Sequence, residues 1–282
     1  MKCGFIGLGN MGAPMAANLA ATGCQPIVYD KAGTAERAPE GAIQAASLAE
    51  VTAAETVFLS LPDGPVVAAV AAEIAASNQR RTTAVIDTST IGVEAAQSIW
   101  RELDGAGIGF CDAQVSGGTA GAKAGTVAIM FSGPRAIFDS LTEPLAAMGN
   151  PFYVGAEAGQ GQAMKLLNNY LSATAMAATS EAISFGLSAG LDPSLMVEIL
   201  NASSGQNTAT ADKFPNRIIP GKYDAGFTNT LLKKDLKLYL AGVQKSGTPR
   251  RLGENLVALW RDFHAAQPDA DFTRIFPFVK DQ

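Results

Sequence analysis

Apolar positions follow two different spacings over the first half of the chain. The segments 2–7 (KCGFIG) and 24–30 (CQPIVYD) are short apolar runs of strand length, and segment 10–23 between them repeats its apolar residues with helical spacing up to Gly23. Further apolar runs follow, most of them separated by Ala-rich helical stretches, at 56–62, 83–90, 108–115 and 126–133. This order predicts a mostly parallel sheet covered by helices.

The alternation stops after segment 151–155, and the remaining patterns have helical spacing. One pattern rich in Ala, Leu and Met runs from about residue 162 to residue 190, without Pro and without Gly before Gly186. Further helices are predicted at 193–202, 230–245 and 248–265, with a loop rich in Gly and Pro at 203–226. We therefore expect two domains, an α/β domain at 1–159 and an all-α domain at 160–282.

The long apolar helix predicted in the second domain needs more cover than a small helical domain supplies. One explanation is that part of it packs against a second subunit, and the other is that it is buried within its own chain. We expect the first, and hence a homo-oligomer, a dimer or a tetramer.

Composition excludes several classes of function. The chain has 282 residues, 48% of them hydrophobic and 17% charged, which suits a globular protein with a large core. Its net charge of −5 and the lack of a dense Lys/Arg run argue against nucleic acid as a partner. Three separated cysteines and one histidine form neither a metal site nor a disulfide framework. The uncharged stretch between Lys2 and Asp30 contains Asn, Pro and Gln, so we expect a cytoplasmic protein without a membrane partner.

Three glycines follow the first predicted strand in the pattern G-x-G-x-x-G. Gly7 permits a tight turn, Gly9 lets the backbone approach a pyrophosphate, and Gly12 lets the next helix pack closely on the strand. The helix N-terminus at Asn10 and Met11 offers backbone N–H groups and the positive end of a helix dipole. Because a strand precedes the pattern and a helix follows it, we predict a Rossmann-type dinucleotide-binding domain.

Asp30 ends the second predicted strand, where a carboxylate can accept hydrogen bonds from the adenosine ribose hydroxyls of a dinucleotide. The same carboxylate would repel a 2′-phosphate. Lys31 beside it is a cation that would partly offset this repulsion. We therefore expect NAD as the cofactor in preference to NADP.

Several motifs, taken in order, resemble the β-hydroxyacid dehydrogenase family, which includes 3-hydroxyisobutyrate dehydrogenase and tartronate semialdehyde reductase. The motifs are GFIGLGNMGAPMAANL at 4–19, DTST at 87–90, DAQVSGG at 112–118, GQGQAMKLLNN at 159–169 and KKDL at 233–236. The resemblance covers nearly the whole chain. It departs from the family pattern at Gln114 and at Val93, since the family usually has proline at both positions.

In this family a lysine on the first helix after the dinucleotide-binding domain is the general acid/base, and the matching residue is Lys165. The residues themselves support this role. Burying a lysine in an otherwise apolar helix beside a cofactor site costs free energy, and such a residue therefore indicates a functional role. Burial also favours the neutral amine, which can accept the proton of an alcohol. Asn169 lies one turn later on the same face and is expected to orient Lys165 or to hold the substrate.

Other site residues are expected at the ends of predicted strands. Ser116, Gly117 and Gly118 follow a strand, and the resemblance implies that their backbone N–H groups and the Ser116 hydroxyl hold a substrate carboxylate. The resemblance also implies that a second set of residues lies along the dinucleotide: Leu61, Pro62, Ser89, Thr90 and Lys234. Because the motif KKDL offers two lysines, Lys233 is an alternative to Lys234.

The sequence thus predicts an oxidoreductase that transfers a hydride between a small 3-hydroxy acid, or its semialdehyde, and NAD. One alternative is an imine reductase on the same scaffold, against which Lys165 argues. A second is a member of the family that binds a dinucleotide without catalysis. A third is a relative of 6-phosphogluconate dehydrogenase, which needs a basic cluster for a sugar-acid phosphate, and only scattered cations such as Lys213 and Arg217 are present. The identity of the hydroxy acid and the physiological direction stay open.

Overall fold

The computed structural model describes residues 2–281, and the chain divides into two compact units, Met1–Lys165 and Leu166–Gln282. We call them the sheet unit and the helical unit. Among the described residues, no helix combines the length and the apolar character needed to cross a membrane.

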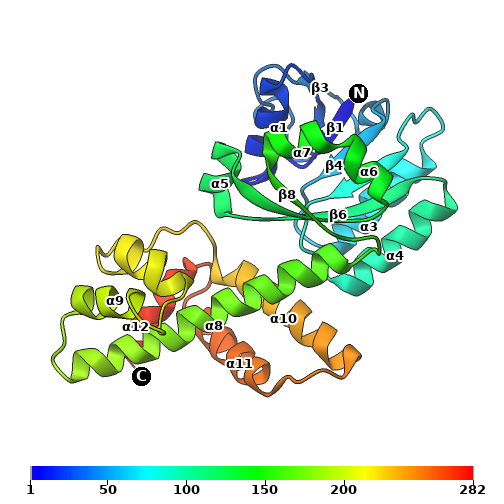
Figure 1. Ribbon diagram of the computed structural model, residues 1–282. Coiled ribbons are helices and arrows are strands. Elements are labelled where there is room, and N and C mark those ends of the chain that lie inside the picture. Colours follow the sequence, from blue (N-terminus) through cyan, green and yellow to red (C-terminus); the bar gives the residue numbers. More distant parts are fainter. Residues whose placement is uncertain (1, 282) are drawn as a thin grey trace. The chain divides into compact units, whose positions relative to one another are not determined.

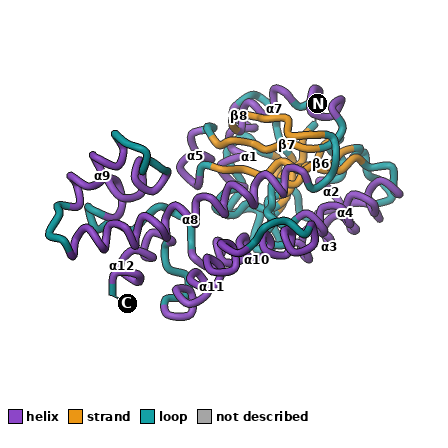
Figure 2. Tube along the Cα trace, turned by 60° about the horizontal axis from the view of Figure 1, so that its bottom comes forward, coloured by secondary structure: helices purple, strands orange, loops and turns teal. Residues whose placement is uncertain are grey.

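The sheet unit contains one eight-stranded sheet (Figures 1 and 2). Its strands are β1 (Cys3–Ile6), β2 (Ile27–Tyr29), β3 (Ile43–Gln44), β4 (Thr56–Leu59), β5 (Ala84–Asp87), β6 (Gly109–Ser116), β7 (Val127–Ser132) and β8 (Gly149–Gly155). Their order in the sheet is β3-β2-β1-β4-β5-β6-β7-β8, and β6 and β7 are the antiparallel pair in an otherwise parallel sheet. The chain moves from β1 to one side of the sheet and returns to the other side at β4, so the strand order reverses between β1 and β4.

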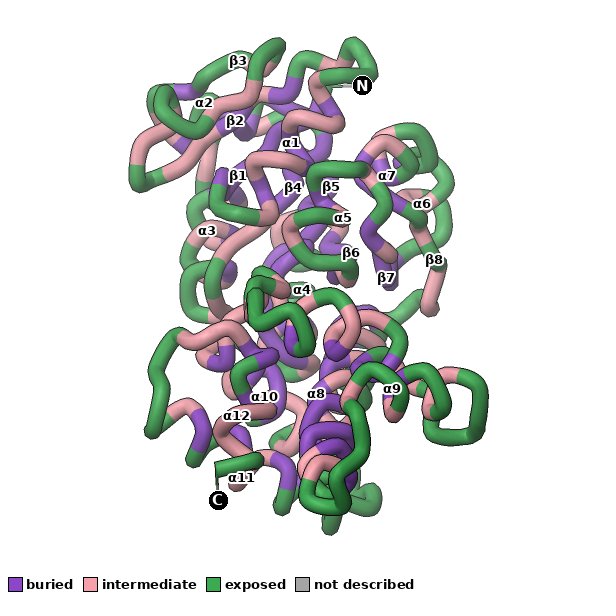
Figure 3. The backbone as a smooth tube through the Cα atoms, turned by 90° about the vertical axis from the view of Figure 1, so that its left-hand side faces the viewer, coloured by how far each residue is buried: buried purple, intermediate pink, exposed green. Residues whose placement is uncertain are grey.

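Helices cover both faces of the sheet. They are α1 (Gly12–Ala21), α2 (Leu48–Val51), α3 (Gly64–Ala76), α4 (Val93–Gly105), α5 (Gly118–Ala124), α6 (Arg135–Ser140) and α7 (Thr142–Met148). Alternate strand residues point to opposite faces, so that Phe58 packs in the core under α1, α5 and α7, and Val57 and Leu59 pack in the core under α2, α3 and α4. The central strands β1, β4 and β5 are buried along their whole length, and Figure 3 shows the covering helices more exposed than these strands. Burial on both faces explains why the strands are nearly continuous apolar runs.

The helical unit has its own core. Its elements are α8 (Gln160–Ser188), which begins in the sheet unit, α9 (Pro193–Asn201), the π-helix η1 (Ala209–Ile218), α10 (Asn229–Ser246), α11 (Arg251–Ala266), the 3-10 helix η2 (Phe272–Arg274) and α12 (Ile275–Lys280). Trp260 and Phe263 of α11 and Phe214 of η1 are fully or almost fully buried in this core. Asp192 and Thr228 cap α9 and α10 by accepting hydrogen bonds from backbone N–H groups in the first turns.

The predicted fold class, a Rossmann-type α/β domain followed by an all-α domain, is confirmed. The prediction of a loop over 203–226 is wrong in part, because η1 occupies the middle of that segment. Thr210, Phe214 and Ile218 recur every fourth residue and are buried, so one face of a largely polar segment packs on the core. The proline within the segment, Pro215, hid this pattern. The division at 159/160 stays a prediction, and Gly159 immediately precedes α8.

Candidate active site

The glycine-rich turn joins β1 to α1, where the strand order reverses. Gly7 has a φ of +94°, and a Cβ on this residue would lie 2.2 Å from the Ser60 carbonyl oxygen. A Cβ on Gly12 would lie 1.9 Å from the Gly7 carbonyl oxygen, so the helix start can pack on the turn only if this residue is glycine. A Cβ on Gly9 would have no atom within 4 Å. The backbone is therefore tightly packed at the first and third glycines and open at the second.

The residues after this open glycine form the N-terminus of α1. Asn10 is exposed and Met11, the N-cap residue, is half-buried and makes no side-chain cap. The positive end of the helix dipole therefore lies beside Gly9. An open backbone at Gly9 next to a helix N-terminus fits the pyrophosphate of a dinucleotide.

Asp30 follows β2 directly and is held against the glycine-rich turn. One carboxylate oxygen, Oδ2, accepts a hydrogen bond from the Leu8 N–H at 2.7 Å, and Oδ1 accepts one from the Ala32 N–H at 2.8 Å. The Arg37 guanidinium lies 3.6 Å from Oδ2. Each oxygen has a further lone pair for a ribose hydroxyl. The sequence pointed to Lys31 as the nearby cation, and the structure places Arg37 closer to the carboxylate.

Four predicted cofactor residues lie at the ends of the neighbouring strands β4 and β5. Leu61 and Pro62 follow β4, and Ser89 and Thr90 follow β5. The Leu61 N–H donates a hydrogen bond to Ser89 Oγ at 2.8 Å, which joins the two turns. The Ser89 N–H in turn donates to Oδ1 of Asp87 at 3.0 Å. The ends of these strands and the glycine-rich turn share the carboxyl edge of the sheet, where open α/β sheets bind ligands.

The predicted carboxylate anchor lies at the end of β6, the next strand in the sheet. Ser116 is the last residue of β6, and α5 begins at Gly118. Gly117 and Gly118 have φ values of +140° and +65°, and both are exposed. A Cβ on Gly118 would meet no atom within 4 Å, so its backbone is open to a ligand. Their role in substrate binding stays a prediction.

A buried carboxylate holds the start of α8. Oδ2 of Asp112 accepts hydrogen bonds from the Gly159 N–H at 2.5 Å and from Ser132 Oγ at 2.8 Å. Ser132 Oγ also accepts a hydrogen bond from the Gly161 N–H at 2.9 Å. Burial raises the pKa of Asp112 to about 6, and the hydrogen bonds from Ser132 and Gly159 limit this increase.

The next residue of α8 ties this helix to the turn after β5. Oε1 of Gln162 accepts hydrogen bonds from the Ile91 and Gly92 N–H groups at 3.0 and 3.1 Å, and Nε2 donates to the Ser89 carbonyl at 2.9 Å. Lys165 follows three residues later, on the neighbouring turn of the same helix, and is half-buried. The first turn of α8, the helix that carries Lys165, is therefore hydrogen-bonded to the turn after β5. That turn contains Ser89 and Thr90, two of the predicted cofactor residues.

Asn169 lies in a polar cluster of the helical unit. Its Nδ2 donates to Oδ2 of Asp235 at 2.7 Å, and its Oδ1 accepts from Asn168 Nδ2 at 3.1 Å. Lys234 Nζ lies 3.4 Å from the other oxygen of Asp235. Asn169 and Lys234 are thus joined through one buried carboxylate. Asn168, to which the sequence gave no role, donates the hydrogen bond that the Asn169 side-chain oxygen accepts.

The other lysine of KKDL lies elsewhere on α10. Lys233 Nζ is 2.9 Å from Nδ1 of His264 on α11. Its contact with the histidine favours Lys234 as the residue of this motif that belongs to the predicted site.

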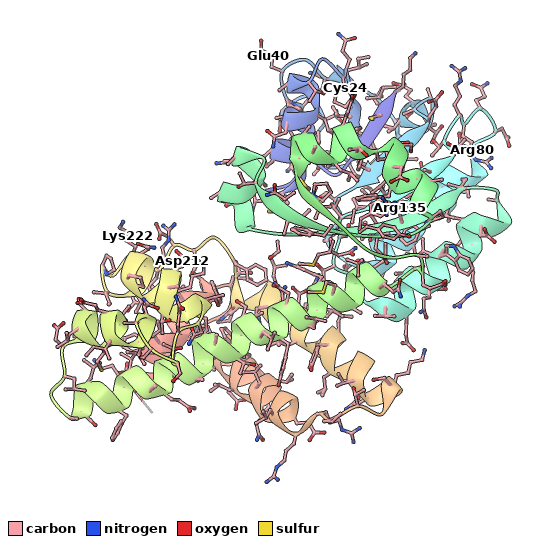
Figure 4. All side chains as sticks on the ribbon, viewed as in Figure 1. Cys24, Glu40, Arg80, Arg135, Asp212 and Lys222 are labelled. Carbon is pink, nitrogen blue, oxygen red and sulfur yellow. The ribbon has the colours of Figure 1, made fainter. Side chains whose placement is uncertain are left out.

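The segment 203–227, which contains the loop predicted at 203–226, carries cations with acidic neighbours. Lys213 is paired with Asp212, and Arg217 Nη1 lies 3.0 Å from Oδ1 of Asp224. Asp212 and Lys222 come from this segment (Figure 4). Because Lys213 and Arg217 are both paired with carboxylates, these two residues do not form the uncompensated basic cluster that a phosphate group requires.

Sequence reasoning missed the residues that support the site. Asp112 and Gln162 lie inside the motifs DAQVSGG and GQGQAMKLLNN, and Asp235 lies in KKDL. Ser132 lies in a predicted strand outside these motifs. Polar residues inside apolar segments were the available signal, since such groups are rarely buried without partners.

Two family models match the chain. The NAD-binding domain of 6-phosphogluconate dehydrogenase matches residues 2–156, and a model described as "NAD-binding of NADP-dependent 3-hydroxyisobutyrate dehydrogenase" matches residues 159–279.

Similar proteins include dehydrogenases of branched hydroxy acids. The chain is 35% identical to 2-(hydroxymethyl)glutarate dehydrogenase of Eubacterium barkeri, over 88% of this chain and 84% of that protein. It is also 35% identical to 3-hydroxyisobutyrate dehydrogenase of Pseudomonas aeruginosa, over 96% of both. A solved structure of Mycobacterium tuberculosis 3-hydroxyisobutyrate dehydrogenase with L-serine is similar to this chain with a TM-score of 0.91 at 30% identity. The match covers 99% of this chain and 98% of that one. An imine reductase of Streptomyces aurantiacus, at 22% identity and a TM-score of 0.65 over 99% of both chains, shares the fold.

Proposed function

The chain belongs to the β-hydroxyacid dehydrogenase family, and we propose that it oxidises a small 3-hydroxy acid with NAD. Its relatives are named as dehydrogenases, and both of its matching family models describe NAD binding. The reverse reaction reduces the corresponding semialdehyde or oxo acid. The observation that carries the proposal is the half-buried Lys165 on a helix whose first turn is hydrogen-bonded at Ser89.

The proposed cofactor site consists of the glycine-rich turn and the ends of three strands. Gly9 and the N-terminus of α1 accommodate the pyrophosphate, and Asp30 accepts hydrogen bonds from the ribose hydroxyls. Leu61, Pro62, Ser89 and Thr90 line the remainder of the dinucleotide. The negative charge of Asp30 supports NAD in preference to NADP, although Arg37 reduces the repulsion of a 2′-phosphate.

The proposed chemistry divides the reaction between cofactor and protein. A bound nicotinamide supplies the acceptor for the hydride of the substrate carbon. The neutral amine of Lys165 takes the hydroxyl proton in the oxidative direction and returns it in the reductive direction. Ser116, Gly117 and Gly118 hold the substrate carboxylate through hydrogen bonds. Asn169, oriented by Asp235, fixes the position of the reacting groups.

The substrate class follows the relatives. Two of them are named for 3-hydroxyisobutyrate and for 2-(hydroxymethyl)glutarate, both of which carry a carboxylate and a primary alcohol. A panel for assay therefore contains these two acids, serine and glycerate, with 6-phosphogluconate for the phosphate alternative and a cyclic imine for the reductase alternative.

The test is NAD and NADP reduction by the wild type and by Lys165→Met. We expect turnover of at least one hydroxy acid with NAD, a loss of about 10²-fold or more in kcat in the variant, and unchanged NAD binding by fluorescence titration. Full activity of Lys165→Met contradicts the acid/base role. Turnover of the imine alone, or NAD binding without any turnover, replaces the proposal by the corresponding alternative.

We also propose that the chain forms a homo-oligomer. Phe185 and Leu171 of α8 are 77% and 60% exposed, and Leu195 and Ile199 of α9 are more than half exposed. Apolar residues exposed at this level on a helix support an interface with a second copy. Light scattering is expected to give a dimer or a tetramer for the wild type, and a monomer for Leu171→Glu/Phe185→Glu. A monomeric wild type contradicts the proposal.

A further inference from the structure

Two buried glutamine amides meet at one backbone oxygen. Gln114 Nε2 donates to the Ser89 carbonyl at 3.3 Å and to the Asp87 carbonyl at 3.1 Å, and Gln162 Nε2 donates to the same Ser89 carbonyl at 2.9 Å. Both glutamine side chains belong to residues with no exposed surface. The turn after β5 is thus linked to β6 by one amide and to α8 by the other.

The second amide also uses its oxygen. Oε1 of Gln162 accepts two backbone hydrogen bonds, from Ile91 and Gly92, which continue the turn after Ser89. Three hydrogen bonds from one side chain therefore fix the first turn of α8 against Ser89, Ile91 and Gly92. A buried amide that loses such partners is left unsatisfied, so the arrangement has little freedom to shift.

The first amide also packs directly on α8. A Cβ on Gly161 would lie 2.7 Å from Oε1 of Gln114, so the glutamine side chain fills the space beside the helix backbone. A proline at position 114 would stiffen the strand end through its fixed φ, but it would have no side-chain donor for the Ser89 carbonyl. Gln114 thus supplies by hydrogen bonding a connection that proline cannot make.

We propose that Gln114 and Gln162 are positioning residues that set the place of Lys165 relative to the turn at Ser89. The inference depends on the proposed function only for the role of Lys165. Gln162 and Lys165 are three residues apart on one helix and so are neighbours on its surface, and a shift of the first turn moves the lysine amine directly. Displacements of about 1 Å at reacting groups reduce rates by up to about 10²-fold.

The first experiment compares Gln162→Met and Gln114→Met with the wild type. Methionine keeps the length of the side chain and removes the amide. We expect kcat to fall about 10- to 100-fold in Gln162→Met and less in Gln114→Met, with KM for NAD unchanged within about twofold. The deuterium isotope effect on kcat, with substrate labelled at the carbinol carbon, should rise because the chemical step becomes slower. Gln160→Met is the matched control, since Gln160 is exposed in the same turn and its side-chain oxygen accepts a hydrogen bond from the Glu157 N–H at the surface.

A conservative variant separates positioning from folding. Gln162→Glu keeps an acceptor for the Ile91 and Gly92 N–H groups but places a carboxylate oxygen beside the Ser89 carbonyl. Protonation restores a donor there, so the ratio of its kcat to that of the wild type should recover as the pH falls. Gln162→Met has no such group, so its ratio should not recover as the pH falls. Because the Gln162 amide also lowers the pKa of Asp112, any change caused by the titration of that carboxylate appears in both variants, and the recovery is read as the difference between them.

Amide hydrogen exchange tests the geometry independently of activity. In Gln162→Met the Ile91 and Gly92 amides should exchange at least about tenfold faster than in the wild type, with little change in Gln160→Met. If the wild type turns over no hydroxy acid but this exchange result holds, the proposed function fails and the positioning of α8 stands. The inference is overturned if amide exchange in Gln162→Met is unchanged, or if its kcat and isotope effect equal those of the wild type. It is also overturned if the variant has a lower melting temperature but a normal kcat per folded molecule.

Discussion

Replacement of Asp112 by asparagine should change how the stability of the sheet unit depends on pH. The carboxylate of Asp112 is buried and accepts hydrogen bonds from Ser132 and Gly159. An asparagine oxygen can accept the same two hydrogen bonds without a charge. The substitution therefore removes the titration and leaves most of the local structure in place.

The magnitude follows from the two pKa values. Burial raises the pKa of Asp112 from 3.8 to about 6, so the folded chain retains a proton that the unfolded chain releases at lower pH. The contribution of this group to stability is complete below about pH 4 and is lost as the pH rises toward about 6. The difference between the two pKa values corresponds to about 3 kcal/mol in the free energy of unfolding.

The assay is urea unfolding between pH 4 and pH 7.5. Trp100 lies on α4 of the sheet unit and Trp260 in the core of the helical unit, so both proteins carry Trp260→Phe to leave Trp100 as the fluorescent reporter. Relative to its parent, Asp112→Asn should gain about 2.5 kcal/mol in unfolding free energy from the lowest pH to the highest, because a part of the full difference lies below pH 4. A difference that is constant with pH, or that changes in the opposite direction, refutes the reasoning. Ser132→Ala, which removes a donor that lowers the pKa, should enlarge the effect.

Three further predictions concern the cofactor and the polar cluster around Asn169. Gly12→Ala should prevent correct folding of the turn, because its Cβ would lie 1.9 Å from a backbone oxygen. Gly9→Ala meets no atom within 4 Å, so it should keep the wild-type melting temperature but weaken NAD binding about tenfold or more. Asp30→Ala should lower kcat/KM for NAD by about tenfold or more and reduce the ratio of NAD to NADP activity, and an unchanged ratio contradicts the role of this carboxylate. Asp235→Ala removes the acceptor that orients Asn169, so it should lower kcat by a larger factor than it raises KM for NAD. A variant with the kcat and KM of the wild type would exclude this orienting role of Asp235.

Local patterns in the sequence were enough to predict the sheet, the long helix and the glycine-rich turn. At Gly7 and Gly12 the reason for glycine is steric, and the G-x-G-x-x-G spacing after a strand identifies it without any tertiary information. Asp30 was identified in the same way, from its place at the end of the second apolar run. These features depend on residues that are near one another in the chain.

The connections of α8 could not be predicted, because their partners are distant in the sequence. Gln162 and Ile91 are 71 residues apart, and Gly159 and Asp112 are 47 residues apart. No periodicity relates such positions, and glutamine in a helix is usually an exposed residue. The functional roles of the predicted site residues stay predictions until the variants above are measured.

The continuity of α8 limits which changes in chain length the protein can accept. Lys165 and Asn169 lie on either side of the division between the two units, yet both belong to one uninterrupted helix of 29 residues. An added or deleted residue between them would turn Asn169 by about 100° around the helix axis and remove it from the face that carries the lysine. Sequences that diverge from this one should therefore vary in length within their loops, such as 203–207, and keep a spacing of four at this pair.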